Sequence, residues 1–106
     1  MSPTSAPNEH FHAILRWASY PEMAPSVKFG DPVSGRVDKL SDWPMGGPMR
    51  PESGDLCVSY SVEGFGLHPE WRTDPLRRWV SHGNVLLKVV RWLQDDLDAT
   101  YAGRHA

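Results

Sequence analysis

The sequence predicts an α+β domain in which a small antiparallel sheet of about three to four strands packs against a long C-terminal helix. Two observations predict this class: short runs with alternating apolar and polar residues occupy the first two thirds of the chain, and an apolar repeat at helical spacing occupies the last third. A chain of 106 residues has room for one hydrophobic core, so we expect a single domain over residues 9–106.

Residues 1–20 predict an arm followed by a strand. Residues 1–8 are mostly small or polar and bury too little surface to offset the entropy of ordering, so we expect a flexible N-terminal arm. Apolar and polar side chains alternate in residues 9–20, which favours a strand. Its apolar face contains Phe11, Ala13, Leu15 and Trp17. A short helix is the alternative, because Phe11, Ile14, Leu15 and Ala18 also fit a helical period.

Residues 26–55 predict a ragged hairpin followed by a long loop. A Gly-Asp-Pro turn at residues 30–32 separates two short extended segments within residues 26–40. Residues 41–55 contain three prolines and three glycines and show no apolar period, so we expect an irregular loop there. Trp43, Met45 and Met49 lie in this loop, and two interpretations fit them: a lid over the neighbouring strand or contact with a partner.

Residues 56–63 predict the most regular strand of the chain. Four apolar side chains alternate with four small or polar ones. The apolar set is Leu56, Val58, Tyr60 and Val62. The opposite face consists largely of Cys and Ser, which would let a helix, a loop or a ligand approach the sheet closely.

Residues 74–101 predict one long helix. Asp74 can cap its first turn, and Pro75 suits the first helical position. Gly83 weakens a helix by about 1 kcal/mol relative to Ala, but the apolar repeat keeps its phase through Gly83, so we expect a kinked, continuous helix. Its length would be roughly 42 Å at 1.5 Å per residue, so we expect part of it to project from the domain or to be shared in a homodimer. A strand over residues 85–93 is the alternative.

The predicted core combines side chains from the strands with one face of this helix. Its members are Leu15, Trp17, Val58, Tyr60, Leu86, Val90 and Leu93. Val85, Val89 and Trp92 form a second apolar strip on the helix. One core face does not need both strips, so we expect the helix to contact its own sheet on both sides or another chain.

The composition is that of an ordinary globular protein. The net charge is −2, so overall charge does not identify a partner, although residues 71–94 hold five Lys/Arg against one Asp. No apolar run approaches the length needed to span a membrane, and the N-terminus lacks the features of a signal peptide. With a single cysteine, Cys57, the chain is expected to be cytoplasmic and without a membrane association.

No residue pattern predicts catalysis or metal binding. The isolated candidates are His10, His12, Cys57, Ser59, Ser61, His68, His82, Asp95, Asp96 and Asp98. The two nearby histidines lack a third ligand at zinc-site spacing, and the aspartates lack the spacing of a calcium loop. No nucleophile motif surrounds the cysteine or the serines, and the glycines do not form a phosphate loop. We therefore expect no catalytic residue, no metal and no cofactor.

The sequence instead predicts a non-catalytic protein-binding module, such as a small inhibitor, immunity or adaptor protein. Trp, Arg and Met are typical of protein interfaces. The predicted contact residues are Trp43, Met45, Met49, Arg77, Arg78, Arg91 and Trp92. A nucleic-acid-binding module is the alternative, because the arginines of residues 71–92 lie among Trp71, Trp79 and Trp92. A small enzyme that uses Cys57 and a histidine is a further alternative.

Overall fold

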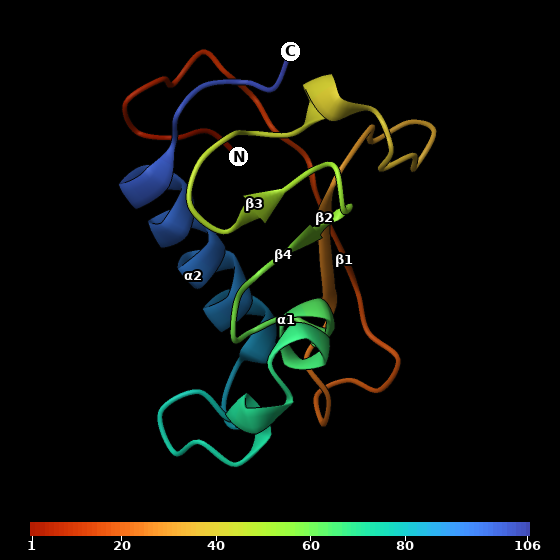
Figure 1. Cartoon of the computed structure of the whole chain (residues 1–106), viewed down its shortest axis with the longest axis vertical. Coiled ribbons are helices and arrows are strands. Elements are labelled where there is room, and N and C mark those ends of the chain that lie inside the picture. Colours follow the sequence, from red (N-terminus) through yellow and green to blue (C-terminus); the bar gives the residue numbers. More distant parts are fainter.

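The computed structural model describes residues 1–106 and confirms the predicted α+β class (Figure 1). The elements are β1 (Ala13–Arg16), β2 (Ser26–Phe29), η1 (Leu40–Asp42), β3 (Met49–Arg50), β4 (Asp55–Leu56), α1 (Val62–Leu67), η2 (Pro69–Arg72) and α2 (Val85–Thr100). The strands form two antiparallel sheets, β1–β2 and β3–β4, instead of a single sheet of three to four strands. None of the helices is both long and apolar enough to cross a membrane.

Strand β1 confirms the predicted alternation in residues 9–20, and the helical alternative is wrong. Its partner is β2, with Ala13 opposite Phe29 and Leu15 opposite Val27. The predicted hairpin within residues 26–40 is wrong, because the second extended segment forms no strand. The Asp31 carboxylate accepts hydrogen bonds from the backbone N–H groups of the next two non-proline residues, at 2.7 and 3.2 Å, and this local turn replaces strand pairing.

The predicted irregular loop, residues 41–55, is tied into the core. Its last part forms the short β3–β4 hairpin. Trp43 is fully buried, its indole N–H donates to the Val37 carbonyl at 2.9 Å, and its ring meets Phe29 edge-on at 5.7 Å. Met49 is also buried. The interpretation of Trp43 and Met49 as partner contacts is therefore wrong, and these side chains belong to the protein's interior.

The predicted strand over residues 56–63 is mostly absent, because only Leu56 pairs in β4. The chain turns after it, and Ser61 caps α1 by accepting a hydrogen bond from the Gly64 N–H at 3.0 Å. A Cβ atom at Gly64 would lie 1.7 Å from the Val58 carbonyl oxygen, so this turn requires glycine. The capping serine and the close glycine outweigh the alternating pattern.

Helix α2 begins at Val85, so the predicted continuous helix over residues 74–101 is wrong, as is the alternative strand over residues 85–93. Gly83 has a positive φ of 74°, a conformation outside a right-handed helix. Asn84 then caps α2, because its side-chain oxygen accepts a hydrogen bond from the Leu87 N–H at 3.0 Å. Residues 74–84 form one turn, at residues 75–77, and otherwise irregular backbone, and Leu76 in the turn is 92% exposed.

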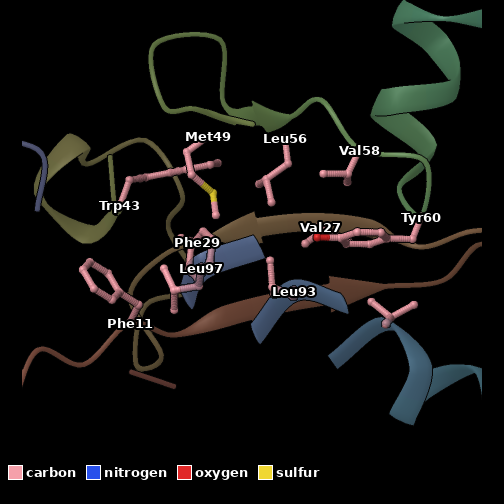
Figure 2. Close-up of a cluster of buried hydrophobic side chains, with 11 residues drawn as sticks. Phe11, Val27, Phe29, Trp43, Met49, Leu56, Val58, Tyr60, Leu93 and Leu97 are labelled. Atoms are coloured by element: carbon pink, nitrogen blue, oxygen red, sulfur yellow. The ribbon is translucent and has the colours of Figure 1, made fainter. Parts of the chain in front are cut away.

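The core lies between the two sheets and one stripe of α2 (Figure 2). The stripe consists of Val85, Val89, Leu93 and Leu97, all fully buried. Of the predicted core, Val58, Tyr60 and Leu93 are buried, and Leu15 and Trp17 pack at its margin. Leu86 and Val90 are instead exposed, because the helix is rotated so that Val85 and Val89 of the second apolar strip face inward together with Leu93, while Trp92 of that strip stays 44% exposed.

Both chain ends pack against the rest of the protein. In the segment expected to form a flexible arm, the Thr4 N–H donates to Asp98 at 2.7 Å, and Gln94 donates to the Ser2 carbonyl at 2.8 Å. Near the other end, Arg104 pairs with Glu9 at 2.9 Å, and its guanidinium carbon lies 4.2 Å from the centre of the Phe11 ring. These contacts join residues more than ninety positions apart in the chain.

The break in the helix at Gly83 can be tested, because replacing this glycine changes the free energy of unfolding in opposite directions with and without the break. Gly83→Ala should lower the free energy of unfolding by about 1 kcal/mol, because alanine resists a positive φ. Inside a continuous helix the same change would raise it by about 1 kcal/mol. Gly83→Asn should cost less than Gly83→Ala, since asparagine tolerates this conformation better. Urea unfolding of the three proteins measures the difference, and a stabilised alanine variant would contradict the break at Gly83.

Burial of Trp43 gives a second test. Trp43→Ala should lower the free energy of unfolding by about 3–5 kcal/mol, because it removes a filled volume in the core. Leu76→Ala, at an exposed position, should stay within about 0.5 kcal/mol of the parent protein. Both values come from urea unfolding curves. Equal, small effects would place Trp43 on the surface.

Candidate protein-binding groove

One groove of about 620 Å³ lies between residues 57–60, the loop of residues 71–80 and one flank of α2. Three tryptophans and three cationic side chains contribute to its lining. They are Trp71, Trp79, Trp92, Arg77, Arg78 and Lys88. This lining defines the tryptophan groove. Its volume lies within the range of about 300–1,000 Å³ that is typical of ligand pockets.

The tryptophans are held by contacts within the chain and keep part of their surface open. Trp92 is 44% exposed and lies 5.7 Å from the Tyr60 ring, between ring centres. Trp71 stacks on His68 at 4.2 Å. The Trp79 indole N–H donates to the Pro21 carbonyl at 3.0 Å. These contacts fix the rings before any partner binds, which lowers the entropic cost of binding.

The cationic side chains of the groove differ in how they are paired. Arg77 forms an ion pair with Asp74 at 2.7 Å and lies over the Trp71 ring at 5.9 Å. Arg78 and Lys88 form no ion pair within the chain. The Lys88 ammonium donates only to the His82 carbonyl. Two positive charges in the groove therefore lack an internal carboxylate partner.

Asp74 shows how the loop of residues 71–80 is stabilised. Its carboxylate accepts a hydrogen bond from the Leu76 N–H at 2.9 Å as well as the bond from Arg77. The backbone bond and then the arginine lower the pKa of the Asp74 carboxyl below its usual value. The residue that was predicted to cap a long helix thus stabilises a turn and orients Arg77.

Tyr60 and Asp96 join the two sides of the groove. The Tyr60 hydroxyl donates to the Asp96 carboxylate at 2.5 Å. Burial raises the pKa of the Tyr60 hydroxyl far above its usual value, and the bond to Asp96 and the negative charges of Asp96 and Asp95 raise it further. The hydroxyl therefore stays protonated and fixes the 57–60 segment to α2.

The groove also contains the two candidate nucleophiles. Cys57 and Ser59 line it, but no histidine does. His68 is engaged by Trp71 and by Glu70, whose carboxylate lies 3.0 Å from its Nδ1 atom. No histidine therefore lies beside the thiol or the hydroxyl in this groove. The structure contains no group of three or more His, Cys, Asp or Glu side chains placed to hold a metal ion.

The structure brings together only part of the predicted contact set. Arg77, Arg78 and Trp92 line the same groove. Met45 is 37% exposed, but its backbone pairs with the C-terminal tail through the Gly103 carbonyl and the Ala102 N–H. Arg91 is exposed outside the groove lining, and Trp43 and Met49 lie in the core.

No pattern in the sequence predicts the bond between Tyr60 and Asp96. Tyr60 belongs to the predicted core, and Asp96 is one of three nearby aspartates without the spacing of a calcium loop. The two residues are 36 positions apart and no motif links them, so the signal is absent from the sequence. Comparison with protein-family models, with curated proteins and with solved structures finds no match to this chain.

The Tyr60 hydroxyl predicts a pH dependence of stability. In the unfolded chain it ionises near its ordinary pKa of 10.0, whereas in the folded chain it keeps its proton. Its contribution to stability is therefore complete below about pH 10 and is lost as the pH rises above that value. The free energy of unfolding, measured with urea at increasing pH, should fall more steeply for the parent protein than for Tyr60→Phe.

Tyr20 supplies the control for this experiment because its side chain is 53% exposed. Tyr20→Phe should retain the alkaline slope of the parent protein. If Tyr60→Phe also retained it, the buried, protonated hydroxyl at the groove would be contradicted.

Proposed function

We propose that the chain is a non-catalytic protein-binding module that holds a segment of another protein in the tryptophan groove. A small inhibitor, immunity or adaptor protein would act in this way. The observation that carries the proposal is the gathering of three tryptophans and three cationic side chains around one open groove. Trp and Arg are enriched among the residues that contribute most binding energy at protein interfaces.

The groove favours a partner segment that combines apolar and acidic side chains. The exposed part of Trp92 and the neighbouring Trp71 ring offer apolar surface for an aromatic or aliphatic anchor. Arg78 and Lys88 offer positive charges that no carboxylate of this chain neutralises. An acidic side chain on the partner would supply the missing pairs.

Nucleic acid is the alternative occupant of this surface. Arginines beside flat rings suit phosphates and stacked bases. However, the Asp95 and Asp96 carboxylates line the same groove and would repel a phosphate backbone, with its charge at every nucleotide, more than a protein segment that carries a single acidic side chain. The net charge of −2 also differs from the basic balance of most nucleic-acid-binding domains. These charges favour a protein partner.

Catalysis by Cys57 has less support than either kind of binding. The thiol lies in the groove without a histidine beside it. Asp96, one of the two carboxylates in the groove, is bound by the Tyr60 hydroxyl. The groove therefore lacks the pairing of cysteine with histidine that commonly activates a cysteine nucleophile.

Affinity capture followed by calorimetry tests the proposal. A protein captured from the native source on the immobilised chain is purified and titrated against the parent protein and two variants. Trp92→Ala should weaken binding about 30-fold or more, because a central aromatic anchor contributes about 2 kcal/mol or more. Arg78→Ala should weaken binding at low salt more than at high salt, since its charge is screened.

Arg36→Ala is the matched control, because Arg36 is an exposed arginine that does not line the groove. It should leave the affinity unchanged. Circular dichroism of each variant checks that the fold persists. Binding that is insensitive to Trp92→Ala would contradict the proposal. Tight binding of a single-stranded oligonucleotide that weakens steeply with salt would favour the nucleic-acid alternative.

A further inference from the structure

Strand β1 has one edge whose backbone groups have no partner within the chain. β1 pairs only with β2, and the Gly30 N–H donates to the His12 carbonyl at 3.0 Å. In an antiparallel ladder the bonded positions alternate, so Ile14 and Arg16 also bond to β2. The N–H and C=O groups of Ala13 and Leu15 therefore point away from β2, and they form no hydrogen bond within the chain.

The same edge already accepts one residue in strand geometry. Phe11 lies two residues before Ala13, so its backbone N–H and C=O groups point away from β2 like those of Ala13 and Leu15. The Met1 ammonium donates to the Phe11 carbonyl at 2.7 Å, and the Phe11 N–H donates to the Met1 carbonyl at 2.8 Å. Two residues that exchange both backbone bonds form the bonded pair of an antiparallel ladder. The chain itself thus starts a third strand on this edge and continues it for one residue only.

The opposite edge of the sheet is protected. On β2, the Val27 N–H donates to the Glu63 carboxylate at 3.0 Å, and the Val62 N–H donates to the Pro25 carbonyl at 2.8 Å. Figure 1 shows α1 beside β2. No residue of β1 is fully buried; the strand contains no proline, and its one charged side chain, Arg16, lies at its end, although its length of four residues limits the edge it presents. One edge is therefore covered and the other is open.

We propose that the open edge of β1 pairs with the same edge of a second copy of this chain. Two antiparallel β1 strands would join two sheets into one four-stranded sheet about a two-fold axis. Exposed strand edges favour such self-pairing, because both copies present the same unpaired donors and acceptors. This inference does not depend on the tryptophan groove.

The contact at Phe11 selects the register of this pair. With Leu15 on the two-fold axis, Leu15 faces its own counterpart, and Ala13 faces Trp17 of the second copy. On the outer face Ile14 then lies opposite Arg16, so like charges are not opposed. A shift that placed Ala13 opposite Leu15 would place Trp17 opposite Phe11, whose backbone groups are already bonded to Met1. The register centred on Leu15 avoids this competition.

Sedimentation equilibrium and amide hydrogen exchange test the proposal. The mass should rise from monomer to dimer as the protein concentration approaches the millimolar range. The Ala13 and Leu15 amides should become protected over the same range, whereas the Ile14 and Arg16 amides should be protected at every concentration. Exchange of the unmodified protein gives this result without a variant that might fail to fold.

Ala13→Pro removes an outward-pointing N–H and leaves the bonds between β1 and β2 in place. It should weaken dimerisation about tenfold or more, because two intermolecular hydrogen bonds are lost. Ala13→Ser is the matched control, because it keeps the N–H group at the same position, and it should dimerise like the parent protein. A monomer at all concentrations would overturn the proposal. So would a dimer that survives Ala13→Pro but is lost in Leu87→Glu, since the contact would then lie on α2.

Discussion

Burial of one stripe of α2 is the constraint on which the other features depend. The sheets have two strands each and cannot enclose a core alone, so the helix supplies the missing side through Val85, Val89, Leu93 and Leu97. Since 3.6 residues make one turn, burial of Val89 and Leu93 turns Trp92 to the flank of the helix. That flank becomes a wall of the tryptophan groove, with Tyr60 beside Trp92.

Local patterns in the sequence predicted the fold class, the strand at β1 and a helix near the C-terminus. They did not predict the rotation of α2, because Leu86 and Val90 are as apolar as Val85 and Val89, and only the shape of the core distinguishes the two strips. The apolar repeat of residues 74–101 continues through Gly83, but the helix does not, because the positive φ of Gly83 is incompatible with a right-handed helix. The buried position of Trp43 depends on Phe29 and Val37, which no local pattern connects to it.

The sequence predicted several residues of the candidate site but not the groove that they line. Arg77, Arg78 and Trp92 were expected to contact a partner, and the structure places them around one groove. The methionine loop was expected to join them, yet Met49 is in the core and Met45 lies beside the C-terminal tail. The groove depends on contacts between distant segments, such as the bond from Tyr60 to Asp96. The open edge of β1 is a separate surface, and its unpaired groups are backbone atoms.

Hydrogen exchange at the tryptophan indole N–H groups distinguishes the side chains of the core from those of the groove. NMR should show slow exchange at Trp43, whose indole is buried and bonded to Val37. Trp92 should exchange rapidly in the free protein and slowly when a partner protein is bound. Equal protection of Trp43 and Trp92 in the free protein would contradict the account, as would an unchanged Trp92 in the complex.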